Sequence, residues 1–142
     1  MTSRHLVLAM VAGTVLLSGG LILWQQNRQS ARPEPHAGPM IAVSRPDLSK
    51  VELDGEIAFQ ANCATCHGDK ADGRNGIGPP LVHKIYEPGH HADGAFYLAV
   101  KQGVRAHHWT FGNMPPVATV TETDVDNIVG YVRALQRANG IY

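Results

Sequence analysis

A five-residue motif, Cys63-Ala64-Thr65-Cys66-His67, constrains this 142-residue chain more than any other feature. Two cysteines separated by two residues and followed at once by a histidine are typical of a c-type haem attachment site. Each thiol adds to one vinyl group of the porphyrin, and the adjacent imidazole becomes an axial ligand of the iron. The motif occurs once in the chain, so the sequence predicts one covalent haem c bound by Cys63, Cys66 and His67.

Other uses of a Cys-x-x-Cys pair fit this sequence less well. A thioredoxin-like redox pair is expected in a βαβ context, which the flanking residues do not supply. A zinc site of the finger type requires further ligands at matching spacing, and the chain contains only these two cysteines. A disulfide across so short a loop would be strained. Only haem attachment explains the histidine that directly follows the pair.

The charges are unevenly distributed, although the formal net charge is zero. Residues 1–50 carry five Lys and Arg against two Asp and Glu, whereas residues 51–142 carry seven against ten. There is no basic stripe, so nucleic-acid binding has no support. The acidic second part predicts docking on the basic surface of a protein partner, in an interaction that salt weakens.

The first 24 residues predict a membrane anchor. An uncharged run of 19 residues from Leu6 to Trp24 follows Arg4. At about 1.5 Å per residue it would span roughly 28 Å, which is close to the thickness of a bilayer core. The apolar run is longer than that of most signal peptides and continues beyond the small residues at positions 18–20. We therefore expect an uncleaved anchor at residues 1–24, with a cleaved signal peptide as the alternative.

The rest of the chain divides into a linker and a domain. Residues 25–50 contain four prolines and few apolar side chains, which is typical of a flexible linker. Residues 51–142 carry the cysteine motif and most of the periodic apolar pattern. A chain of this length buries a modest core by itself, and a covalent haem would add a large apolar surface. We expect residues 51–142 to be the haem domain.

Three helices are expected in this domain. Asp54 can cap a first helix from Gly55 to about Cys66. A middle helix is expected over residues 95–102, ending at Gly103. Between them, residues 72–80 are rich in glycine and proline and predict a loop.

The last helix has the clearest signals. Thr121 and Asp124 have the spacing of a capping box, and apolar residues follow with helical periodicity over 125–135. Gly140 is a plausible end signal. No segment predicts a strand, so the expected fold class is all-α.

In combination, these motifs resemble the class I (mitochondrial-type) cytochrome c family over nearly all of residues 51–142. The resemblance is carried by Gly55-x-x-x-Phe59-x-x-x-Cys63, Cys63-x-x-Cys66-His67, Gly78-Pro79-x-Leu81, Met114-Pro115 and Tyr131 in the terminal helix. It implies three or more helices around a covalent haem.

The resemblance also implies two specific contacts. Gly55 and Phe59 are expected to cross the last helix at Ile128 and Tyr131, because only a residue without a side chain lets two helix backbones approach closely. The carbonyl of Pro79 is expected to accept a hydrogen bond from the axial histidine, which fixes the orientation of its ring.

Met114 is predicted to be the second axial ligand of the iron. The resemblance places the ligand at Met114-Pro115, and elimination agrees, because the other methionines lie in the predicted anchor and linker (Met1, Met10 and Met40). A thioether opposite an imidazole raises the reduction potential relative to two histidines. The alternative is that Met114 fills the core. His107 or His108 would then be the ligand.

Histidines crowd the middle of the domain. They are His83, His90, His91, His107 and His108. One hypothesis is a second metal site, for example for copper, since imidazole suits this metal. The alternative, which we favour, is polar side chains that face solvent or the haem propionates.

Two further residues are candidates for haem contacts. Arg105 and Trp109 are predicted to donate hydrogen bonds to a haem propionate, with Tyr86 as a further candidate. The alternative is an ordinary surface charge for Arg105 and a core aromatic for Trp109.

The sequence therefore predicts an electron-transfer protein and no enzymatic activity of its own. We expect a membrane-tethered monohaem cytochrome on the periplasmic side of a bacterial inner membrane. Its donor would be a quinol-oxidising complex or a dehydrogenase, and its acceptor a terminal oxidase or reductase. No small-molecule substrate is expected. The alternatives are a permanent haem subunit of an oxidase or dehydrogenase complex, or a haem sensor that binds a ligand or copper.

Overall fold

The computed structural model describes residues 38–142, and the predicted anchor at residues 1–24 lies outside this part. The described residues form the helices α2 (Lys50–Asn62), α3 (Ala64–His67), α4 (Gly94–Gln102) and α5 (Glu122–Ala138), with a 3-10 turn at Lys84–Tyr86. This part of the chain contains isolated β-bridges but no β-strand, so the all-α expectation is confirmed for residues 38–142. None of its helices has the length and apolar character needed to cross a bilayer.

The predicted start of the first helix was wrong. α2 begins at Lys50, with Ser49 as its N-cap, because Ser49 and Glu52 form a capping box that satisfies two backbone N–H groups. The Asp54 carboxylate instead pairs with the Lys50 ammonium group one turn earlier, at 2.8 Å. The helix also breaks at Cys63, so α2 and the short α3 replace one continuous helix.

The other two helices follow the sequence pattern. α4 ends at Gln102, where Gly103 takes a positive φ of 74°, as expected of a residue that terminates a helix. α5 begins after Thr121, and both hydrogen bonds of the Thr121–Asp124 capping box are present. The two helices differ in burial: α5 contributes most of the buried apolar residues of the domain, whereas no residue of α4 is fully buried.

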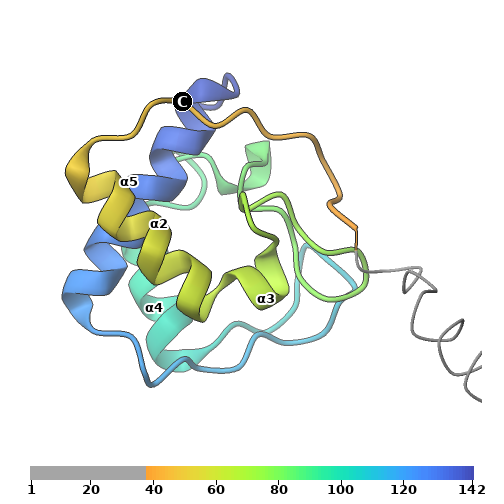
Figure 1. Ribbon diagram of the computed structural model, residues 1–142. Helices are drawn as coiled ribbons and strands as arrows, with labels where there is room; N and C mark the ends of the chain where they lie inside the picture. Colours follow the sequence, from red (N-terminus) through yellow and green to blue (C-terminus); the bar gives the residue numbers. More distant parts are fainter. Residues whose placement is uncertain (1–37) are drawn as a thin grey trace, which may run out of the picture. The chain divides into compact units, whose positions relative to one another are not determined.

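α2 and α5 pack across each other, and this contact organises the domain (Figure 1). A methyl group placed on Gly55 would overlap the backbone carbonyl of Asn127 on α5. One turn further along α2, the rings of Phe59 and Tyr131 lie 5.5 Å apart at an interplanar angle of 56°. The predicted crossing of Gly55 and Phe59 against the last helix is therefore present.

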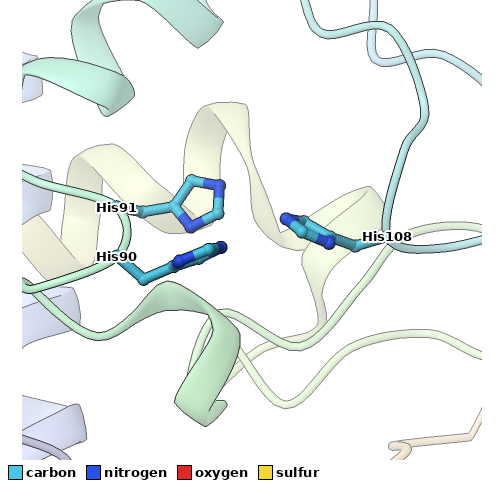
Figure 2. A group of neighbouring side chains, drawn as sticks. All are labelled: His90, His91 and His108. Carbon is cyan, nitrogen blue, oxygen red and sulfur yellow. The ribbon is translucent and has the colours of Figure 1, made fainter.

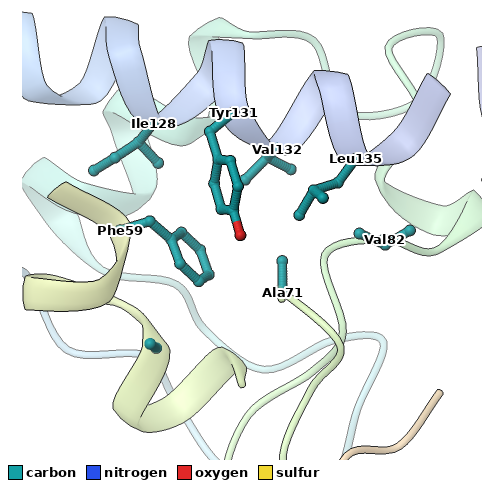
Figure 3. Packing of buried hydrophobic residues seen from close by; sticks show 8 residues of the cluster. Phe59, Ala71, Val82, Ile128, Tyr131, Val132 and Leu135 are labelled. Carbon is teal, nitrogen blue, oxygen red and sulfur yellow. The ribbon is translucent and has the colours of Figure 1, made fainter. Parts of the chain in front are cut away.

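The buried core lies along this crossing (Figure 3). Phe59, Tyr131 and Leu135 are fully buried in it. Ala71 and Val82 join it from the loop between α3 and the 3-10 turn, as the close view of the cluster shows. Removing these side chains from water supplies most of the drive to fold, because buried apolar area contributes about 25 cal/mol per Å².

Residues 38–49 fall inside the predicted linker, yet they lie against the domain. The backbone N–H of Met40 donates to the carbonyl of Asp72 at 3.0 Å. Ser44 exchanges two hydrogen bonds with the side chain of Asn139, at 2.9 and 2.8 Å. Arg45 donates two hydrogen bonds of 2.7 Å to the Glu56 carboxylate, which lowers the pKa of that group. Polar contacts of this kind cannot be inferred from the proline content that suggested a linker.

Gly55→Ala is expected to lower the free energy of unfolding by about 2 kcal/mol or more, because the added methyl forces α2 and α5 apart. Urea unfolding of the purified domain measures the change. Gly130→Ala is the matched control, since an added methyl there meets no atom within 4 Å and a glycine inside a helix is intrinsically unfavourable. It should be neutral or stabilise by up to about 1 kcal/mol. Equal effects of the two substitutions would contradict the close crossing.

Candidate functional site

A cavity of about 570 Å³ lies among α2, α3, α4 and the 103–117 segment. Its volume is within the range of small-molecule and cofactor pockets, roughly 300–1,000 Å³. The lining is mainly apolar, and Phe59 and Ile128 form part of both this wall and the core. The four residues predicted to bond to the haem or its iron line it together: Cys63, Cys66, His67 and Met114.

The two cysteines are placed at the junction of α2 and α3. Cys63 is the residue at which the two helices meet, and Cys66 lies one turn later. A methyl group on Gly78 would overlap the Cys66 carbonyl, so the glycine lets the 74–78 loop lie directly against the motif. The motif is thus held by backbone contacts on the side of this loop.

Burial raises the pKa of the Cys63 thiol to about 11, and the neighbouring Cys66 adds to the effect. Cysteines of redox-active Cys-x-x-Cys pairs need the opposite shift, because the thiolate is the reactive form. The environment of Cys63 therefore argues against a thioredoxin-like redox pair.

His67 is oriented by the loop that follows it. Its Nδ1 lies 2.8 Å from the carbonyl oxygen of Pro79, and since a carbonyl can only accept, Nδ1 carries the proton. Burial lowers the pKa of the imidazole, against the opposing effect of the Pro79 carbonyl. The ring is therefore neutral near pH 7, and Nε2 retains the lone pair that a metal requires.

Met114 reaches the cavity on a separate loop. Its backbone exchanges two hydrogen bonds of 2.9 Å with Val104, which ties the ends of the 104–114 loop together. Gly103 makes this possible, since a methyl group there would overlap the Met114 carbonyl.

The elimination that favoured Met114 was incomplete, because Met40 also lies against the domain. Its sulfur is beside Gly73 rather than in the lining of the cavity. Among the methionines of residues 38–142, Met114 is the one that lines the cavity.

Trp109 and Arg105 differ in their placement. The indole Nε1 of Trp109 is buried and has no hydrogen-bond partner within residues 38–142, and the ring lines the cavity. A buried donor without a partner is costly, so it fits an acceptor carried by a bound group. The side chain of Arg105 is exposed and does not line the cavity. Tyr86 lines it too, and burial raises the pKa of its hydroxyl, against an opposing effect of the adjacent Trp109 side chain. The hydroxyl therefore stays protonated near pH 7 and can donate.

Sequence reasoning missed the buried guanidinium of Arg133. It donates to the carbonyls of Tyr86 and His91 at 2.7 and 2.6 Å and to the Asp93 carboxylate at 2.8 Å. Gln136 accepts a further bond from it at 2.6 Å. These contacts fasten the 83–93 loop, at the edge of the cavity, to α5.

Residues 53–136 match the profile of the cytochrome c family. The chain belongs to this family. It is also similar to the subunit CcoP of the cbb3-type cytochrome c oxidase from Rubrivivax gelatinosus, with 35% identity over 86 residues. The match covers 59% of this chain and 26% of that subunit, so this chain corresponds to about a quarter of its relative.

Membership of the cytochrome c family implies a covalent haem c and supports a role in electron transfer. The residues present fit such a group. The cavity has a suitable volume, and both cysteines and His67 line it. The Trp109 indole N–H could donate a hydrogen bond to an acceptor on the bound group. The resemblance in the sequence is thus confirmed at the level of the family.

Arg133→Ala is expected to lower the free energy of unfolding by about 3 kcal/mol, because two loop carbonyls lose their donor in a buried setting. Guanidinium unfolding of the haem-loaded protein measures this. The control is Arg137→Ala, one turn away on α5, where a half-exposed side chain pairs with Glu52 at 3.2 Å. It should cost less than about 1 kcal/mol. Comparable losses for the two arginines would contradict the bracing role.

Proposed function

We propose that this chain is a membrane-tethered cytochrome c with one haem that carries single electrons outside the bacterial cytoplasmic membrane. Residues 51–142 would form the haem domain, with residues 1–24 as the anchor. The observation that carries the proposal is the shared cavity, which brings the Cys63–His67 motif and Met114 together although they are far apart in the chain.

The residues of the cavity divide the work of holding the haem. Cys63 and Cys66 would bind it covalently, and His67 and Met114 would supply the two axial ligands. Pro79 holds the His67 ring, and Trp109 would donate to a propionate. When bound, the haem supplies a one-electron Fe(III)/Fe(II) couple.

The protein's part in electron transfer is to keep this site fixed. If His67 and Met114 both bind the iron, no position would be open for a substrate, so we propose no enzymatic activity for the chain. Apolar side chains such as Phe96 and Phe111 exclude water from the cavity. Because the loops on both sides are braced, little rearrangement accompanies a change in charge at the site.

Two partner arrangements follow from different observations. The acidic residues of 51–142 favour transient docking on a basic partner, such as a quinol-oxidising complex or dehydrogenase as donor and an oxidase or reductase as acceptor. The similarity to an oxidase subunit favours permanent membership of an oxidase complex.

Mild detergent extraction followed by size-exclusion chromatography distinguishes the free electron carrier from the permanent subunit. A free shuttle elutes alone, and its reduction by the donor slows with salt, whereas a subunit co-elutes with a catalytic chain.

Met114→Ala should remove the sulfur-to-iron charge-transfer band of the ferric protein and allow carbon monoxide to bind the ferrous form. The wild type should show the band and resist carbon monoxide. Met40→Leu is the control, since this methionine lies outside the cavity lining, and it should behave as the wild type. If the wild type lacks the band and binds carbon monoxide readily, the electron-carrier proposal fails in favour of a haem sensor.

Trp109→Phe should lower the reduction potential. Without the indole donor, the propionate charge is less well compensated, and negative charge near the iron favours the ferric state. Potentiometric titration of the haem-loaded protein measures the shift. Phe111→Leu is the control, because Phe111 stacks on Trp109 with ring centroids 5.7 Å apart and carries no donor. An equal shift in the control would assign the effect to packing.

A further inference from the structure

Three histidines from two separate loops come together at the rim of the cavity. His90 and His91 precede α4, and His108 lies in the loop that leads to Met114 (Figure 2). One ring nitrogen from each lies within 4.8 Å of those of the other two. The rings of His90 and His91 face that of His108 across the gap between the loops, with centroid separations of 5.5 and 5.4 Å.

The ring of His91 is already prepared for coordination. Its Nδ1 lies 2.6 Å from the carbonyl oxygen of Ile85, so Nδ1 carries the proton and Nε2 keeps its lone pair. Metal-binding histidines are generally oriented in this way, by a carbonyl or carboxylate that accepts the other ring proton. The Ile85 carbonyl serves this purpose within the same loop.

Both loops are braced from behind. Arg133 binds the carbonyls of Tyr86 and His91, which fixes the backbone of the first loop at two points that follow Ile85. In the second loop, the N–H of Ala106 donates to the Asn113 side chain at 2.9 Å. A site whose ligands stand on braced backbone loses little conformational entropy when it binds.

The chemistry of the donors selects the class of metal. The three groups are imidazoles, and no carboxylate belongs to the cluster. Calcium and magnesium require oxygen ligands, so they do not fit. Imidazole suits copper and zinc, and by the general order of stability Cu²⁺ binds such a site more tightly than Zn²⁺.

We propose that His90, His91 and His108 bind one divalent late transition-metal ion, Cu²⁺ or Zn²⁺, at the rim of the haem cavity. His90 and His108 are exposed, so the ion has access from solvent. His91 and His108 also line the cavity, so the site adjoins the haem without sharing its axial ligands. The competing use of these side chains is contact with the haem propionates.

The test uses the full chain with its haem attached and oxidised. Calorimetric titration with ZnCl₂ should show one tight equivalent. Titration with Cu²⁺, followed by electron paramagnetic resonance, should show coordination by several imidazole nitrogens. His108→Gln and His90→Gln should each weaken binding at least about 10-fold, since loss of a supporting partner alone has an effect of that order. His90 is exposed and lies outside the cavity lining, so His90→Gln should leave the haem spectrum unchanged.

His107→Gln is the matched control. His107 adjoins His108 and is also exposed, but it is not one of the three converging residues. The His107→Gln substitution should change the affinity for the metal by less than about 2-fold.

The proposal is overturned if the haem-loaded protein binds no tight equivalent of either metal. It is also overturned if binding survives in the triple Gln variant of His90, His91 and His108, or if His107→Gln weakens it equally.

Discussion

The contact between α2 and α5 at Gly55 is the constraint on which the rest of this domain depends. The two helix backbones can meet there because the residue of α2 at the contact, Gly55, has no side chain. The meeting sets the position of Phe59 against Tyr131, and these two residues anchor the core. Phe59 and Ile128 also belong to the wall of the cavity. The crossing of α2 and α5 therefore shapes both the core and the cavity. A substitution at the crossing would alter the packing of both.

α5 has a different task along each part of its length. Its first turns contribute Val125 and Ile128 to the cavity wall, and its middle crosses α2. Its last turns carry Arg133, which holds the 83–93 loop, and Asn139 just beyond the helix holds residues 38–49. One helix thus positions two segments, 83–93 and 38–49, that contain no helix long enough to position themselves. This explains how a small domain can surround a large cofactor with short loops.

The sequence was most informative where a local rule decides the outcome. The Thr121–Asp124 cap and the stop at Gly103 follow from spacing and backbone geometry, and both could be predicted. Ser49 was missed because it competes with Asp54 for the same role, and only the partner Glu52 decides between them. The Cys63–His67 motif correctly predicted that both cysteines and the histidine line the cavity, because haem attachment requires these residues at this spacing.

Long-range polar contacts were largely beyond prediction. The packing of Met40 depends on the carbonyl of Asp72, which no composition rule reveals. Arg133 offers a partial signal. It follows Val129 by four residues, so it falls on the apolar face of α5, where a charged side chain requires partners. Its partners, however, are mainly backbone carbonyls about 40 residues away, and their positions emerge only from the fold.

The burial of Cys63 bears on the order in which the holoprotein is assembled. With a pKa of about 11, roughly one thiol in ten thousand is ionised at pH 7 once the helices have packed. Because the thiolate is the nucleophile, the folded chain is a slow substrate for addition to a vinyl group and for oxidation. We therefore expect addition to a vinyl group to be faster while Cys63 is still exposed to water than after its burial at the junction of α2 and α3.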